Sequence, residues 1–138
     1  PLVVCLPDVA VSTRDARRVV PETASMEDLV ETVGNAATLA IGMCRSDPEL
    51  VGLGMSDPVV TPERARLITG YDDVRERAFG AGATGVTVSG AGPAVIAACR
   101  ERDRRDVAAA MLDAFAGAGI EARAYQTQIG RGSTVLDA

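Results

Sequence analysis

Two short apolar runs, residues 85–88 and 94–99, are separated only by Ser89-Gly90-Ala91-Gly92-Pro93. Runs of this length that contain valine or isoleucine and end at glycine or proline are typical of β-strands. So short a connection joins antiparallel neighbours, because a parallel pair needs a crossover of a dozen residues or more. We therefore expect an antiparallel hairpin here, and the rest of the chain must fold around it.

The remaining pattern predicts further strands and several helices. Residues 2–6 form an apolar run closed by Pro7, residues 121–129 alternate, and residues 133–136 are predicted as a last short strand. Helical patterns cover residues 12–20, 25–44, 48–55, 61–69, 72–80 and 102–116, and residues 25–44 have the most regular apolar face. This order predicts an α+β fold, a ferredoxin-like split βαβ antiparallel sheet with extra helices in the first crossover.

Helix starts are marked by polar side chains. Ser12 or Thr13 is expected to cap the first helix, and Ser25 the second. We expect the Thr61 hydroxyl to cap the helix that follows it, and Asp72 or Asp73 to open the next.

Composition excludes several chemistries. The 138 residues suit one domain, and they contain no histidine, no tryptophan and no lysine. This chain therefore cannot use an imidazole-based nucleophile system, Schiff-base chemistry or the lysine of a Walker A phosphate-binding loop. The side chains that remain, arginine, carboxylates and hydroxyls, are suited to binding and positioning anions. We expect no catalytic side chain and no metal ligands in this chain.

Charge and hydropathy limit the partners. A net charge of −5 argues against nucleic acid, and no apolar run is long enough to span a membrane. Cys5, Cys44 and Cys99 lie far apart in apolar surroundings, so we expect buried thiols in a reducing cytoplasm. The strand-like start without methionine suggests a piece cut from a longer chain.

Three features are candidates for chemistry, and each has a simpler interpretation. The turn at Ser89, Gly90, Ala91 and Gly92 is either a plain hairpin connection or an amide-lined bend open to an anionic ligand. Thr13 and Arg17, four residues apart on one helix, either face solvent or hold a carboxylate together. Arg64 lies in the first turn of a helix, where the dipole does not favour a cation, and is either a surface residue or directed at a ligand.

The same segments resemble a known family. Residues 85–94, Gly-Val-Thr-Val-Ser-Gly-Ala-Gly-Pro-Ala, look like the third conserved motif of the GHMP kinases. Residues 11–17 with Val20-Pro21, and residues 62–68 with Gly70-Tyr71, resemble segments of the homoserine kinase family within that superfamily. The resemblance covers nearly the whole chain in the right order. It departs at Thr61, where the family often has an acid, and at Ala91, where serine is commoner.

The resemblance implies ATP-dependent phosphorylation of the homoserine hydroxyl, on the route to threonine. Thr13, Arg17 and Arg64 would hold homoserine, with the two arginines pairing with its carboxylate. Gly90 and Gly92, with Ser89 and Ala91 beside them, would shape the floor beneath the transferred phosphate. GHMP kinases bind ATP and Mg²⁺ mainly through a glycine- and serine-rich loop in an N-terminal domain, and nothing in residues 1–138 matches that loop. We expect the chain to be the C-terminal domain alone, inactive by itself.

Alternatives remain at this point. Mevalonate, shikimate and related acids are also carboxylates, so another GHMP kinase would use the same arginines. A non-catalytic amino-acid-binding module would also suit a ferredoxin-like fold. A homodimer is left open.

Overall fold

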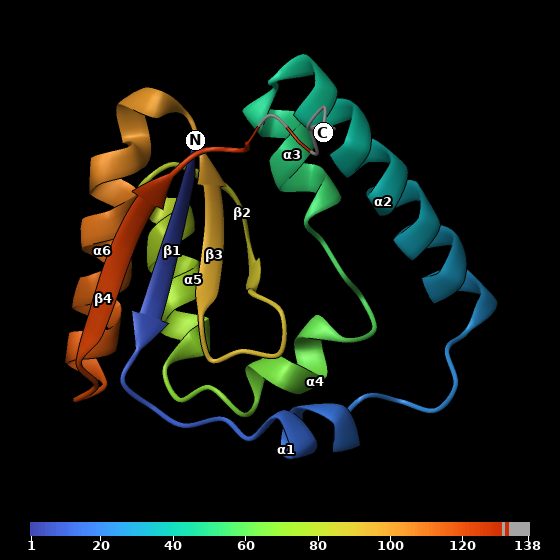
Figure 1. Ribbon diagram of the computed structural model, residues 1–138, viewed down its shortest axis with the longest axis horizontal. Coiled ribbons are helices and arrows are strands. Elements are labelled where there is room, and N and C mark those ends of the chain that lie inside the picture. Colours follow the sequence, from blue (N-terminus) through green and yellow to red (C-terminus); the bar gives the residue numbers. More distant parts are fainter. Residues whose placement is uncertain (131, 133–138) are drawn as a thin grey trace, which may run out of the picture.

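The computed structural model describes residues 1–130 and 132, and its centre is a four-stranded antiparallel sheet (Figure 1). The strands are β1 (Leu2–Pro7), β2 (Ala83–Val88), β3 (Val95–Cys99) and β4 (Ala122–Thr127). They lie in the order β2-β3-β1-β4, so β1 and β3 form the centre of the sheet. The chain order and this strand order together define the ferredoxin-like split βαβ fold, as the sequence predicts.

The expected hairpin is present. Strands β2 and β3 pair antiparallel, with Val88 opposite Val95 and Val86 opposite Ala97. The register shifts between Ala83 and Gly85, which marks a bulge near the start of β2. The glycine-rich turn therefore joins two neighbouring strands at one end of the sheet.

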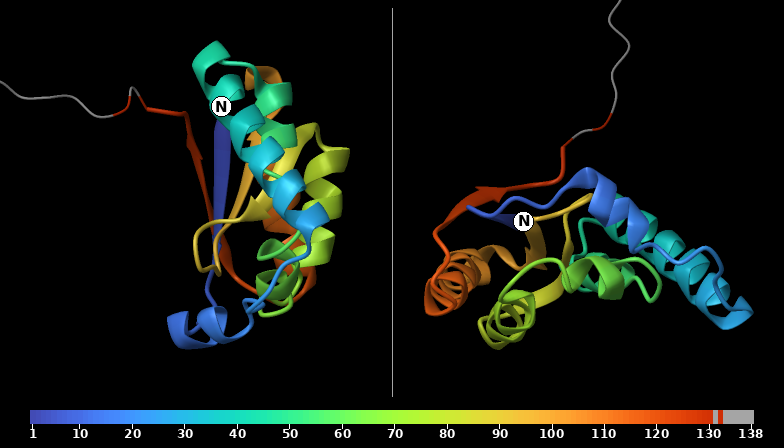
Figure 2. Two further views of the ribbon diagram at one scale, coloured as in Figure 1. Left: turned by 90° about the vertical axis from the view of Figure 1, so that its right-hand side faces the viewer. Right: turned by 90° about the horizontal axis from the view of Figure 1, so that it is seen from below.

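Most of the helices lie in the first crossover. Between β1 and β2 the chain forms α1 (Thr13–Arg18), α2 (Met26–Arg45), α3 (Pro48–Gly54), α4 (Thr61–Ala65) and α5 (Tyr71–Gly80). After β3 come a short 3₁₀ turn (Glu101–Asp103) and α6 (Arg104–Gly117). Helices α5 and α6 pack side by side on one face of the sheet, while α3 packs against β2 and carries α2 along its outer side (Figures 1 and 2).

The core lies between the sheet and helices α5 and α6. Val3 and Cys5 of β1 and Val95 of β3 are fully buried, and they meet side chains of both helices: Val74, Ala78, Val107, Met111 and Phe115. Burial raises the pKa of Cys5 to about 11, so this thiol stays protonated and packs as a small apolar group. The core therefore fixes the sheet and the hairpin from which the turn projects.

Helix α2 begins at the predicted cap and is nevertheless exposed along its apolar face. Ser25 accepts a hydrogen bond from the Asp28 amide at 3.0 Å, and Asp28 bonds back to the Ser25 amide at 3.1 Å. The apolar side chains have no core beneath them within the described residues, since Met26 is 72%, Val30 66% and Val33 61% exposed. A pattern this regular predicts a helix correctly, but it does not say which molecule covers the face.

Several local expectations are corrected by the structure. Thr61 is the first residue of α4 rather than its cap, and α4 ends at Ala65 rather than near Thr69. Helix α5 begins at Tyr71 after Gly70, which has a φ of 83°, so Asp72 and Asp73 lie in its first turn and do not cap it.

Two further sequence predictions have different outcomes. Cys44 is exposed on α2, whereas Cys5 and Cys99 are buried as expected. The predicted strand at residues 133–136 lies outside the described residues.

Candidate functional site

Arg64 connects two of the three features singled out from the sequence. Its Nε donates to the Ala16 carbonyl of α1 at 3.3 Å, and its Nη1 donates to the Gly90 carbonyl of the turn at 2.8 Å. The side chain therefore lies between α1 and the glycine-rich turn. A guanidinium has five N–H donors, so further donors remain open to a ligand.

The glycine-rich turn is held in a defined shape. The Ser89 amide donates to the Ala94 carbonyl at 2.8 Å, and the Gly92 amide donates to the Ser89 carbonyl at 3.0 Å. Gly90 and Gly92 have φ values of 58° and 83°, in the left-handed region that favours glycine, and the Gly92–Pro93 peptide bond is cis. With glycine at both positions the turn carries no large side chains there, which leaves room for a ligand next to its backbone.

Thr13 and Arg17 lie on the same short helix, as their spacing predicts. Ser12 caps α1 by accepting from the amides of Arg14 at 3.2 Å and Asp15 at 3.5 Å. Thr13 and Arg17 are exposed and line one surface hollow together with Arg14 and Arg18. Because Arg64 binds the carbonyl of Ala16, the residue before Arg17, the structure brings α1, Arg64 and the turn into one neighbourhood.

Asp57 supports this neighbourhood and was not singled out from the sequence. Its carboxylate accepts from the amides of Val59, Val60 and Thr61 and from the Thr61 hydroxyl, all within 3.2 Å. Burial raises the pKa of this carboxyl, but the hydrogen bonds outweigh burial and hold its pKa below the usual range. Asp57 thus anchors the start of the helix that carries Arg64. The Asp-Pro pair in the sequence was the available signal, since aspartate before a turn often bonds to the backbone ahead of it.

A cavity lies beside Arg64. It has a volume of about 350 Å³, large enough for a small metabolite. Its walls come from α2, the end of α3, the segment between α3 and α4, α4, β2 and the turn: Thr32, Asn35, Ala36, Leu39, Gly54, Met55, Ser56, Asp57, Val60, Thr61, Arg64, Thr87, Val88 and Gly90. Thr13 and Arg17 lie outside this wall, on the hollow over α1.

The described residues, 1–130 and 132, contain neither a metal-binding cluster nor a membrane-spanning helix. No group of three or more histidine, cysteine, aspartate or glutamate side chains there could hold a metal ion. No helix in that part of the chain is long and apolar enough to cross a membrane.

Comparison with known proteins defines the class. The family model described as GHMP kinases C terminal matches residues 23–117, which is more than half of the chain. The chain therefore belongs to the GHMP kinase C-terminal domain family, and the resemblance of its glycine-rich motif is confirmed.

Within that class, the chain is similar to homoserine kinases. It is 85% identical to the homoserine kinase of Halorubrum lacusprofundi over 99% of its own length and 68% identical to that of Haloarcula marismortui. Among solved structures, the homoserine kinase of Cytophaga hutchinsonii matches with a TM-score of 0.84 at 34% identity, covering 90% of this chain and 40% of that one. The chain spans 47% of each of the two curated relatives, about half their length.

Proposed function

We propose that this chain is the substrate-binding half of an ATP-dependent homoserine kinase in threonine biosynthesis. The observation that carries the proposal is the position of Arg64, which joins α1 to the glycine-rich turn through two backbone carbonyls. These are the three segments through which the sequence resembles homoserine kinases. Identities of 85% and 68% to proteins of that name support the same conclusion.

Each candidate residue has a role in this proposal. The guanidinium groups of Arg17 and Arg64 pair with the homoserine carboxylate, since arginine offers a planar fork of donors to such a group. The Thr13 hydroxyl contacts the same amino acid. The bare backbone of Gly90 and Gly92 lets the transferred phosphate approach the turn closely, with Ser89 and Ala91 shaping its rim.

The partner half would hold ATP and Mg²⁺. Phosphoryl transfer depends mainly on positioning and on charge stabilisation by the metal and the phosphate-binding loop, and residues 1–138 contain no match to the glycine- and serine-rich loop of GHMP kinases. The exposed apolar face of α2 is a suitable docking surface for this half, because large apolar patches mark interaction sites. The binding site for homoserine would then be closed between the two halves.

The proposal is tested by joining this chain to the part of the Halorubrum lacusprofundi relative that it does not match. We expect homoserine-dependent ATP consumption by the fusion. Arg17→Ala and Arg64→Ala should each raise the KM for homoserine on the order of ten- to a hundredfold, because a charge-assisted hydrogen bond contributes roughly 1.5–3 kcal/mol.

A matched control separates a specific effect from a general loss of charge. Arg105 is exposed on α6, away from the candidate site, so Arg105→Ala should leave the KM unchanged. If Arg17→Ala and Arg64→Ala also leave the KM unchanged, the proposed carboxylate contacts are wrong. A fusion that phosphorylates mevalonate or shikimate and ignores homoserine would overturn the substrate while keeping the class.

A further inference from the structure

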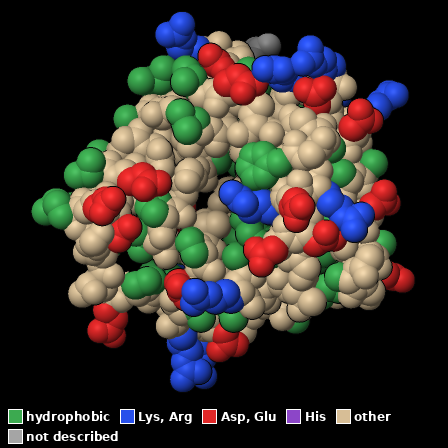
Figure 3. Space-filling view, turned by 180° about the vertical axis from the view of Figure 1, so that it is seen from behind, with side chains coloured by type: hydrophobic (Ala, Val, Ile, Leu, Met, Phe, Trp, Pro, Cys, Tyr) green, Lys and Arg blue, Asp and Glu red, His purple; other side chains and the backbone are tan. Residues whose placement is uncertain are grey.

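A second and larger cavity lies on the far side of α4 from Arg64. Its volume is about 680 Å³, and it opens between α3, α4, α5 and β2. Figure 3 shows the face to which it opens, where a hollow is bordered by apolar, basic and acidic side chains. Five residues line both cavities and form the wall between them: Met55, Ser56, Asp57, Thr61 and Thr87. Within this wall the hydroxyls of Thr61 and Thr87 are joined by a 2.9 Å hydrogen bond.

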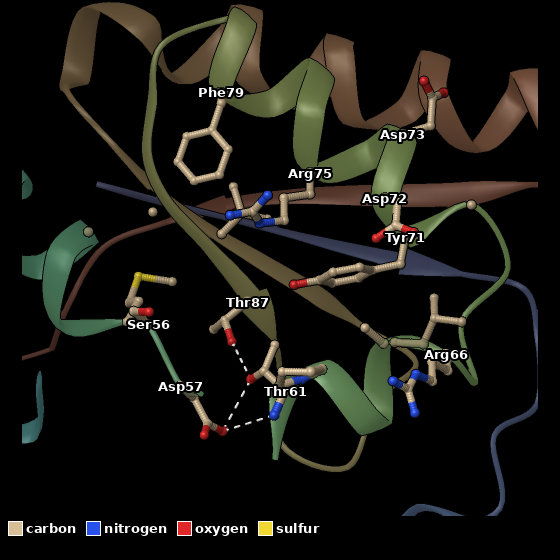
Figure 4. Close-up of a pocket in the computed structure, with 18 residues that line it drawn as sticks. Ser56, Asp57, Thr61, Arg66, Tyr71, Asp72, Asp73, Arg75, Phe79 and Thr87 are labelled. Carbon is tan, nitrogen blue, oxygen red and sulfur yellow. Dashed lines mark hydrogen bonds between the residues drawn. The ribbon is translucent and has the colours of Figure 1, made fainter. Parts of the chain in front are cut away.

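Tyr71 presents a polar atom to this cavity without a protein partner. The residue is only 5% exposed, its ring belongs to the core, and its hydroxyl points into the cavity (Figure 4). Within residues 1–130 and 132 the hydroxyl makes no hydrogen bond. Burial raises the pKa of Tyr71, with a smaller opposing effect from the positive charge of Arg75, so the phenol is a neutral O–H donor at pH 7. Since the hydroxyl faces the open cavity, it is accessible to solvent there and free to donate to an acceptor on a ligand.

Arg75 supplies a cation to the same space. Its guanidinium lies 5.0 Å from the centre of the Phe79 ring and faces the cavity beside the Tyr71 hydroxyl (Figure 4). The other lining arginine, Arg66, is paired with Glu63 at 2.6 Å. Among the described residues Arg75 has no carboxylate partner within salt-bridge distance, so its charge is available to a ligand.

The remaining walls restrict what the ligand can be. Met55, Ile68, Val86 and Phe79 provide an apolar lining deep enough for a short hydrocarbon group. Three acidic residues, Asp57, Asp72 and Asp73, also line the cavity, and Asp73 is paired with Arg77 at 3.0 Å. Their negative charge disfavours a ligand that carries two negative charges. Asp57 is already satisfied by its own backbone contacts.

We propose that this cavity binds a small monocarboxylate with an apolar body, its carboxylate held by the Arg75 guanidinium and the Tyr71 hydroxyl. Two donors then converge on one acceptor group, and the hydrocarbon part packs against the apolar lining. Neither Arg64 nor the glycine-rich turn lines this cavity, so the site is separate from the candidate kinase site and goes beyond the proposed function.

The test is a titration of the ¹⁵N-labelled 138-residue chain followed by two-dimensional NMR. Isovalerate is the probe, 3-methyl-1-butanol its uncharged isostere, and inorganic phosphate the multiply charged anion. We expect isovalerate to shift the amides of Tyr71, Arg75 and Thr87 to saturation, and to bind at least about fivefold more tightly than the alcohol or phosphate.

Variants locate the site. Arg75→Met should weaken isovalerate binding on the order of tenfold, and Tyr71→Phe about three- to tenfold. Arg105 is an exposed arginine on α6, so Arg105→Met should bind isovalerate as tightly as the parent chain does. Because the Tyr71 hydroxyl has no partner to lose, Tyr71→Phe should melt at the parent temperature, which keeps the binding result independent of folding.

Any of three results would overturn the proposal. Equal binding of isovalerate and the alcohol would show an apolar cavity without a carboxylate site. Tighter binding of phosphate would contradict the role of the lining carboxylates. Unchanged affinity in Arg75→Met would remove the cation from the site. None of these results bears on the kinase test, which depends on Arg17 and Arg64.

Discussion

Gly92 has a backbone conformation that favours glycine. Its φ of 83° lies in the left-handed region, and a Cβ added there would lie 3.3 Å from Cδ1 of Ile68 and 3.4 Å from Cγ1 of Val88. A side chain costs roughly 1–2 kcal/mol in that region, and crowding against the core adds to this. We therefore expect Gly92→Val to lower the thermal stability of the chain and, in the active fusion, to reduce kcat strongly.

The two effects are measured on one preparation, by a thermal melt and a steady-state rate. Ala91→Ser in the same turn is the matched control, because this position already has a Cβ and a φ that is not positive. The control should keep both the melting temperature and the rate close to the parent values. A normal kcat in Gly92→Val would show that the turn is only a hairpin connection and has no part in the reaction.

Asp57 is expected to contribute a pH-dependent part of the stability. Asp57→Ala removes the acceptor of three backbone amides at the entry to α4 and should lower the unfolding free energy by about 1 kcal/mol. Asp57→Asn keeps an acceptor and should lower it by less. The folded pKa lies below the usual value, so the advantage of the carboxylate over asparagine is fully present above about pH 4, the pKa of a free aspartate. It is lost as the pH falls through the folded pKa.

Denaturant titrations of the parent and of Asp57→Asn at pH 7 and pH 3 check the sign. The difference in unfolding free energy should shrink at the lower pH. A difference that stays constant, or grows, would show that the charge of Asp57 has no part in holding the helix.

At the scale of elements, the contact between α3 and β2 depends on two glycines. A Cβ on Gly52 would collide with the backbone of Thr84, and one on Gly85 would collide with the backbone of Gly52. Because backbone atoms cannot rotate away, Gly52→Ala should push α3 away from the sheet. We expect it to lower the unfolding free energy by roughly 1–3 kcal/mol. Gly34→Ala in the exposed middle of α2 meets nothing within 4 Å and should stabilise by roughly 0.5–1 kcal/mol.

This pair is compared by chemical denaturation of the isolated chain. Opposite signs for the two glycine-to-alanine changes are the expected result. If both variants are stabilised, α3 has room to shift and the close approach is not a constraint on the fold.

The order of elements could be predicted because periodicity and turn residues act locally. The apolar runs around Ser89 to Pro93 predict the hairpin, and Ser25 marks the start of α2. The role of Thr61 was predicted wrongly because Val60 occupies the cap position of α4 and Asp57, four residues before Thr61, accepts from the Thr61 amide. A local pattern of hydroxyl and proline cannot reveal which of two nearby polar side chains reaches the free amides.

The candidate site was predictable only in part. Thr13 and Arg17 share a helix, as their spacing requires, but the bonds from Arg64 to Ala16 and Gly90 join residues 48 and 26 positions apart. Such contacts follow from how the crossover helices pack, which no local signal encodes. The Tyr71 hydroxyl and Arg75 were missed for the same reason, since only the fold turns them toward one cavity.

At the scale of the whole molecule, the exposed face of α2 distinguishes this domain from a self-contained one. Single exposed apolar residues are ordinary, but Met26, Leu29, Val30 and Val33 repeat on one helix and pack on no core within the described residues. The relatives that the chain matches are about twice its length. Our proposal that the other half covers this face makes the exposed side chains of α2 important for assembly, while its opposite side packs on α3 within the domain.

The last prediction separates those two contributions. In the isolated chain, the double variant Val30→Asp with Val33→Asp should change the unfolding free energy by no more than about 0.5 kcal/mol per site, because both side chains are exposed. The isolated chain, parent or variant, should show no homoserine-dependent ATP consumption.

When the unmatched half of the Halorubrum lacusprofundi relative is added as a separate chain, the parent should bind this half and gain activity, and the double variant should do neither. Ala109→Asp, which adds one negative charge at an exposed position of α6, should behave as the parent. Binding of the half by the double variant with parent affinity would show that α2 is not the docking face, and activity of the parent chain alone would show that no second half is needed.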